Sequence, residues 1–164
     1  MHINPKKKIQ GTYYPPGDKS ISHRSLILTS QAVGKSEITN LLEGEDVINT
    51  LLVMRELGSR ITKKNGKYIV FGLPPGALFQ PKKQLDFGNS GTGIRLLAGL
   101  ISSNNIKATL KGDRSLNKRP MGRVTDHLKK IGASIELKNK SFAPINIKGV
   151  GDAIPINYDI KIPS

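Results

Sequence analysis

Two loops of the sequence carry the residue types that bind small anions at the start of a helix. The first, GDKSISHR at 17–24, precedes the apolar run 26–28. The second, GNSGTGIR at 88–95, precedes the apolar run 96–98. Unpaired backbone N–H groups and the positive end of the helix dipole favour a phosphate or carboxylate at such a place. The sequence therefore predicts two anion-binding loops of similar design.

The first loop offers three polar side chains to an anion. Lys19 can supply a mobile ammonium group, Ser20 a hydroxyl hydrogen bond, and Arg24 a planar fork about one turn later. Gly17 would let the backbone approach the ligand closely. The alternative is that Ser20 only caps the helix, with Lys19 and Arg24 in solvent.

The second loop repeats this arrangement. Asn89 or Ser90 can cap the helix, Gly91 leaves room for a ligand against the main chain, and Arg95 lies within the first turns. The alternative is a glycine-rich cap in which Arg95 pairs with a carboxylate. An arginine at the same place in both loops favours anion binding, because capping alone does not require it.

A third polar cluster is GDRSLNKRPM at 112–121. Pro120 suits the first position of a helix, so Arg119 would lie just before the positive end of that helix. An anion there would contact both the guanidinium group and the helix dipole. The alternative is a solvated basic loop.

An internal repeat of about 70 residues should position these loops. LGSRI at 57–61 is echoed by IGASI at 131–135, and each follows an amphipathic stretch that predicts a helix ending near its glycine. Each glycine precedes a predicted hairpin, and the first hairpin turns at 64–66. Further strands are expected at the ranges 36–41, 106–111 and, as the lead-in of a third unit, 157–162.

The composition limits the class of protein. The chain has 164 residues, a net charge of +14 and 37% hydrophobic residues, which is sufficient for a folded core. Without Cys, and with its three histidines scattered, we expect neither a disulfide nor a metal site. Dispersed basic residues and an aromatic content of only 5% argue against a nucleic-acid partner.

Other partners and cofactors are also limited by the sequence. The glycines near 34–36 and 88–93 lack the spacing of nucleotide-binding loops, so we expect no cofactor. We also expect no membrane partner and a cytoplasmic location, because there is no membrane-length apolar run and the first residues lack the apolar core of a signal peptide.

Three motifs together resemble those of the 5-enolpyruvylshikimate-3-phosphate synthase family: PGDKSISHR at 16–24, GNSGTGIR at 88–95 and GDRSLNKRPMGRV at 112–124. The resemblance implies transfer of the enolpyruvyl group of phosphoenolpyruvate to the 5-hydroxyl of shikimate 3-phosphate, releasing phosphate without a cofactor. It also implies the α/β (α+β) inverse-barrel fold of enolpyruvyl transferases, in which each of two domains has three βαβαββ units.

The resemblance also implies a role for individual residues at the shikimate 3-phosphate site. Lys19 would be catalytic and would contact both substrates, while Ser20 and Arg24 would bind shikimate 3-phosphate. Ser164 is similar to the first residue of the next substrate-binding serine motif of the family.

At the phosphoenolpyruvate site, the resemblance implies that Arg119 binds the anionic groups together with Lys19. Gly91 would leave space beside them, and Asn89 would support the loop. Gly91 resembles the residue of glyphosate-sensitive members, because a methyl group there would crowd that inhibitor.

Members of the resembling family are well over twice as long as this chain. We therefore expect about two of the three units of one domain. The ranges are 1–15 for a lead-in strand of the partner-domain or hinge region, 16–87 and 88–153 for two units, and 154–164 for the start of a third. The remainder, in cis or in trans, would supply the second wall of the site and the proton-handling groups, so the chain alone should not turn over.

Three alternatives to this interpretation remain open. The chain could be a split-enzyme subunit that needs a separately encoded C-terminal part. It could also be a basic nucleic-acid-binding module, although that explains neither the repeat nor the paired loops. The related UDP-N-acetylglucosamine enolpyruvyl transferases differ in the motif at 112–121.

Overall fold

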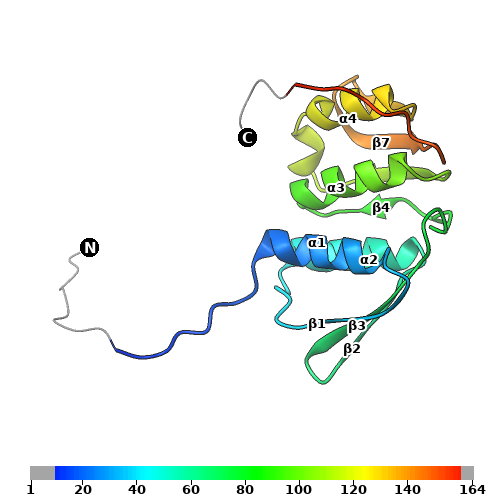
Figure 1. Ribbon diagram of the computed structural model, residues 1–164. Helices are drawn as coiled ribbons and strands as arrows, with labels where there is room; N and C mark the ends of the chain where they lie inside the picture. The colour runs from blue at the N-terminus through cyan, green and yellow to red at the C-terminus, as the bar shows by residue number, and fades with distance from the viewer. Residues whose placement is uncertain (1–9, 160–164) are drawn as a thin grey trace, which may run out of the picture.

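The computed structural model describes residues 10–159, and Figure 1 shows how the elements are arranged. The first group of elements comprises α1 (Lys19–Thr29), β1 (Gly34–Ile38), α2 (Glu45–Glu56), β2 (Arg60–Lys64) and β3 (Lys67–Gly72). The second group comprises β4 (Leu85–Asp86), α3 (Gly91–Ser102), β5 (Lys107–Lys111), the short 3₁₀ helix η1 (Leu116–Lys118), α4 (Gly122–Lys130), β6 (Ser134–Lys138) and β7 (Phe142–Lys148). The α/β class expected from the sequence is confirmed.

Each group of elements builds one sheet. The first sheet has the antiparallel order β1-β3-β2, and the second has the order β4-β5-β7-β6, in which β4 and β5 are parallel. Helices α1 and α2 pack on the first sheet, and α3 and α4 pack on the second (Figure 1). Because α1, α2 and α3 also contact one another, the buried side chains form one continuous core.

Turn residues fix the first predicted hairpin and two helix ends. The hairpin of β2 and β3 turns through Asn65 and Gly66, which have φ values of 50° and 74° and so fit the tight turn that matches strand twist. Gly58 and Gly132 follow the C-caps of α2 and α4 with φ values of 102° and 105°. Glycine adopts this left-handed conformation readily, which is why both helices end there.

Three expected strands differ from the structure. The strand expected at 36–41 runs instead over Gly34–Ile38, because its pairing with β3 ends at Ile38 and Asn40 turns out of the β region with φ of 53°. The lead-in strand expected at 1–15 is absent from the described part, 10–15, which pairs with no neighbouring strand; 1–9 lie outside the described residues. The strand expected at 157–162 is likewise absent from 157–159, and its remainder lies outside them.

The start of α4 also differs from the prediction. The helix begins at Gly122 and not at Pro120. The N–H of Met121 donates to the carbonyl of Ser141 at 2.9 Å, so Met121 is held by the β6–β7 turn before the helix starts. Arg119, restricted by the following proline, is extended with ψ of 133°.

Helices α1, α2 and α3 meet at Thr50. Nδ1 of His23 in α1 lies 2.8 Å from Oγ1 of Thr50 in α2, and both side chains are fully buried. A Cβ atom at Gly93 in α3 would lie 2.8 Å from the same hydroxyl oxygen. The three helices therefore approach as closely as a glycine allows, and His23 takes part in their packing.

Acid should destabilise the fold through His23. Burial lowers the pKa of His23; the charge of Asp46 opposes the shift and that of Lys19 adds to it. The unfolded chain binds a proton near the ordinary pKa of about 6.5, whereas the folded chain binds it only at lower pH. We therefore expect the free energy of unfolding, measured in urea, to fall as the pH drops below about 6.5.

The variant His23→Gln isolates this contribution. Its free energy of unfolding should fall less steeply between about pH 7 and pH 5.5 than that of the wild type, because glutamine stays neutral. A wild-type slope in His23→Gln would contradict this explanation.

Candidate functional site

Two loops lie side by side because β4 and β5 are parallel neighbours. The N–H of Phe87, just after β4, donates to the carbonyl of Lys111 at 2.9 Å, and the N–H of Asp113 donates to the carbonyl of Gly88 at 2.7 Å. The carboxyl ends of the two strands thus open into the loops at 87–90 and 112–121. These loops lead into α3 and α4, so both helices start at the same end of the sheet.

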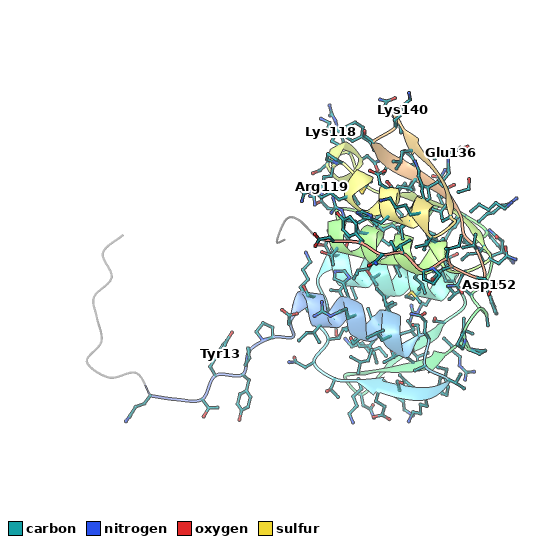
Figure 2. The ribbon with its side chains drawn as sticks, turned by 45° about the horizontal axis from the view of Figure 1, so that its top comes forward. Tyr13, Lys118, Arg119, Glu136, Lys140 and Asp152 are labelled. Atoms are coloured by element: carbon teal, nitrogen blue, oxygen red, sulfur yellow. The ribbon has the colours of Figure 1, made fainter. Side chains whose placement is uncertain are left out.

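Helices α1 and α2 start at that same end of the molecule. Lys19 in the first turn of α1 forms an ion pair with Asp46 in the first turn of α2. Nδ2 of Asn49 in α2 donates to the carbonyl of Phe87 at 3.3 Å, which ties α2 to the loop before α3. In Figure 1 this end faces the side from which the N-terminal segment leaves α1, and Figure 2 shows Arg119 on that side, opposite Asp152.

The first predicted loop differs from expectation in two details. Asp18 caps α1, because its carboxylate accepts the N–H of Ile21 at 2.7 Å, so the alternative that Ser20 is the cap is wrong. A Cβ atom at Gly17 would lie 2.0 Å from the carbonyl oxygen of Asn40. Gly17 is therefore needed for contact with the chain itself and not for the approach of a ligand.

The side chains of the first loop nevertheless lie where an anion could reach them. Ser20 and Arg24 are exposed on the first turns of α1, and neither side chain makes a hydrogen bond within the described residues. Lys19 is exposed as well, and its ion pair with Asp46 is on the surface, where such pairs contribute little to stability. Ser164 lies outside the described residues.

In the second loop, Ser90 is the residue that caps α3. Its buried hydroxyl accepts the N–H of Gly93 at 3.0 Å. Arg95 donates to the carbonyl of Gly91 at 3.1 Å and to that of Pro120 at 3.2 Å. Within residues 10–159 it forms no ion pair, so the alternative that Arg95 pairs with a carboxylate is wrong.

Arg119 joins the second loop to the third cluster. Its guanidinium group donates to Oδ1 of Asn89, and Nδ2 of Asn89 donates to Oδ2 of Asp113 at 2.7 Å. A Cβ atom at Gly91 would lie 3.0 Å from a terminal nitrogen of Arg95 and 3.0 Å from one of Arg119. Four residues predicted from two separate motifs thus form one group, here named the arginine cluster: Asn89, Gly91, Arg95 and Arg119.

Positive charges in the arginine cluster oppose one another. The pKa of Arg95 lies below its ordinary value, first because of burial and then because of the charges of Arg119 and Arg123. Arg95 donates to two carbonyl oxygens and Arg119 donates to the amide oxygen of Asn89, and none of these three acceptors carries a full negative charge. A bound anion would relieve this repulsion, and like charges gathered in this way are typical of a functional site.

Sequence reasoning gave no role to three residues of this region, although Asp113 and Arg123 lie in the motif at 112–124. Asp46 pairs with Lys19, Asp113 holds Asn89, and Arg123 adds to the positive field. Arg123 has a local signal, since it follows Arg119 by four residues at the start of a helix. The two carboxylates have none, because each acts across more than 20 residues of sequence.

The described residues offer neither a metal site nor a membrane-spanning helix. Within 10–159, no three His, Asp or Glu side chains come together in a way that could hold a metal ion. Each helix in this range is too short or too polar to cross a lipid bilayer.

Comparisons with known proteins agree on one family. A family model described as EPSP synthase (3-phosphoshikimate 1-carboxyvinyltransferase) matches residues 3–164. Two curated relatives carry the name 3-phosphoshikimate 1-carboxyvinyltransferase. The protein of Ruegeria sp. is 45% identical and that of Novosphingobium aromaticivorans 46% identical, each match covering 95% of this chain, with 35% and 36% of the relatives covered.

A solved structure of EPSP synthase from Acinetobacter baumannii gives the same result. It superposes with a TM-score of 0.88 at 39% sequence identity, over 94% of this chain and 35% of that chain. The present chain thus spans about a third of the length of the relatives it matches.

Gly91→Ala should weaken anion binding while keeping the fold. The added methyl group would meet the ends of two flexible side chains, Arg95 and Arg119, which can move apart. We expect a thermal midpoint within a few degrees of the wild type and a dissociation constant for inorganic phosphate, measured by calorimetry, that rises by roughly fivefold as charged hydrogen bonds are lost.

Gly99→Ala is the matched control on the same helix. Its added methyl group would have nothing within 4 Å, so phosphate affinity should not change. Its free energy of unfolding should rise by roughly 0.5–1 kcal/mol, because alanine favours the helix. Equal phosphate affinity in Gly91→Ala and Gly99→Ala would contradict the role of Gly91.

Proposed function

The chain belongs to the EPSP synthase (3-phosphoshikimate 1-carboxyvinyltransferase) family, and on this premise we propose that its arginine cluster is part of an enolpyruvyl transfer site. The reaction would move the enolpyruvyl group of phosphoenolpyruvate to the 5-hydroxyl of shikimate 3-phosphate and release phosphate. The observation that carries this proposal is the pair of guanidinium groups of Arg95 and Arg119, which lie at Gly91 and form no ion pair with a carboxylate within residues 10–159.

Phosphoenolpyruvate would bind at the arginine cluster. Arg119 presents a planar fork that suits phosphate and carboxylate oxygens, and Gly91 leaves the space beside it free of a side chain. Asn89 would hold Arg119, and Lys19 would reach the ligand after leaving Asp46. The absence of a side chain at Gly91 also supports a second proposal, that glyphosate can bind here.

Shikimate 3-phosphate would bind at the start of α1. The exposed side chains of Lys19, Ser20 and Arg24 offer two positive charges and a hydroxyl group beside the positive end of an 11-residue helix. Ser164 would complete this group. Since α1, α2 and α3 begin at one end of the molecule, the two substrates would lie near one another.

Catalysis by these residues would be electrostatic. In the net reaction a bond forms between the 5-hydroxyl oxygen and the enolpyruvyl carbon, the bond from that carbon to the phosphate oxygen breaks, and the hydroxyl proton leaves with the released phosphate. Lys19 and Arg119 would stabilise the negative charge that shifts toward the leaving phosphate. No cofactor is needed for this exchange of groups.

Turnover would need more than the residues described. Relatives are about three times as long, and charge stabilisation in a closed site requires a second wall that excludes water. We propose that the remaining part, joined in cis or supplied in trans as in a split enzyme, provides this wall and the groups that move protons. The proposed place of action is the cytoplasm.

The rate of phosphate release from the two substrates tests this proposal directly. The 164-residue chain alone, given both substrates, should release no phosphate above background. Addition of the remaining two thirds of the Novosphingobium aromaticivorans relative should restore turnover. In the restored enzyme Arg119→Lys should lower kcat by roughly 100-fold, because lysine cannot reproduce the planar fork.

Arg60→Lys is the control, because Arg60 packs over Phe71 in the first sheet, away from the cluster. It should keep nearly full turnover. Phosphate release that scales with the chain alone would contradict the need for a second wall. Unchanged turnover in Arg119→Lys would contradict the site itself.

A further inference from the structure

The side-chain amide of Asn89 lies between a cation and a carboxylate. Its oxygen accepts from the guanidinium group of Arg119, and its nitrogen donates to Oδ2 of Asp113 at 2.7 Å. Rotation of the amide by half a turn would set its NH₂ group against the guanidinium donors and its oxygen against the carboxylate. The carboxylate of Asp113 therefore selects the orientation in which Asn89 can hold Arg119.

Asp113 is itself held firmly in place. Its second carboxylate oxygen accepts the N–H of Leu116 at 2.7 Å. Its own N–H donates to the carbonyl of Gly88 at 2.7 Å, and its carbonyl accepts the N–H of Asn117 at 2.9 Å. The side chain thus joins the turn at η1 to the loop before α3.

The charge state of Asp113 supports the same role. The N–H of Leu116 and then the amide of Asn89 hold the pKa of this carboxyl below its ordinary value. An ionised carboxylate is only an acceptor, so it can receive the NH₂ group of Asn89 but cannot donate to its oxygen. Asp113 therefore enforces one amide orientation throughout the neutral pH range.

We propose that Asp113 is a positioning residue, which orients Asn89 so that Arg119 is held beside Gly91 in the geometry that binds the anion. This inference rests on the proposed function of the arginine cluster. Arg95 supports the same loop by donating to the carbonyl of Pro120 at 3.2 Å, so Arg119 and its loop are held by two separate contacts. Asp113 acts through Asn89 and makes no contact with the anion.

Charge and position predict opposite effects for removal of Asp113. A negative charge near an anion site opposes binding, so a purely electrostatic effect would make a neutral variant bind more tightly. Loss of positioning would make it bind more weakly. The direction of the change in affinity separates the two explanations.

Phosphoenolpyruvate and inorganic phosphate are the probes, with dissociation constants measured by calorimetry on the full chain. Asp113→Ala and Asn89→Ala should each weaken binding by roughly tenfold, as expected when a hydrogen bond to a charged group is lost. The double variant should bind no more weakly than either single variant, because both changes remove the same relay. Asp86→Asn, which removes a nearby carboxylate that pairs with Lys111, should keep or slightly raise the affinity.

A second measurement needs no ligand. The N–H signals of the Arg119 guanidinium group in nitrogen-15 NMR should be protected from exchange in the wild type and in Asp86→Asn, and lose that protection in Asp113→Ala. If Asp113→Ala does not fold, Asp113→Asn is measured in its place. It keeps the shape of the side chain, but its single oxygen cannot serve both Leu116 and Asn89.

Each outcome bears on one of the two proposals. Wild-type affinity or tighter binding in Asp113→Ala, additive losses in the double variant, or a protected Arg119 signal without Asp113 would overturn the positioning role. If Arg119→Ala binds phosphoenolpyruvate as tightly as the wild type, the proposed function of the cluster fails instead. If Arg119→Ala loses binding and Asp113→Ala does not, only the present inference fails.

Discussion

The parallel alignment of β4 and β5 is the constraint on which the site depends. Two parallel neighbours end at the same edge of their sheet, and here both ends open into polar loops that continue into helices. Hydrogen bonds of Phe87 and Asp113 across these ends fix the loops against each other. Residues 24 to 30 positions apart in sequence, such as Asn89 with Asp113 and with Arg119, are thereby brought within hydrogen-bond distance.

Close helix packing extends this constraint to the first group of elements. Thr50 of α2 contacts His23 of α1 and limits the residue at 93 to glycine. The first turns of α1, α2 and α3 therefore share one end, where their dipoles add to the charges of Lys19, Arg95 and Arg119. Burial, followed by the charges of Arg119 and Arg123, lowers the pKa of Arg95, so an anion bound beside Arg95 and Arg119 would stabilise the fold.

The parts of this structure that the sequence predicts are those that depend on the conformational preferences of single residues. The hairpin at Asn65 and Gly66, and the helix ends at Gly58 and Gly132, depend on backbone conformations that few residues adopt, so residue type alone predicts them. The two loops at helix starts are predicted to bind anions in the same way, from their residue types, and this binding stays a prediction. Asn89, Gly91, Arg95 and Arg119 were found individually, and the fold brings them together.

The errors came from choices that residue type alone does not decide. Asp18 and Ser20 are both good capping residues, and the local path of the chain selects Asp18. Gly17 was expected to let a ligand approach the backbone. It is glycine because the carbonyl oxygen of Asn40 leaves no room for a side chain there. Pro120 is a favourable helix start, yet the hydrogen bond from Met121 to Ser141 delays α4 by two residues.

A crystal structure of the chain with phosphoenolpyruvate tests the central claim most directly. We predict that an anionic group of the ligand lies within hydrogen-bond distance of the Arg119 guanidinium and directly over Gly91. The chain also offers a basic hollow of about 450 Å³ beside η1, lined in part by Arg114, Lys118 and Lys138. Phosphoenolpyruvate bound in that hollow, with the face over Gly91 empty, would contradict the account.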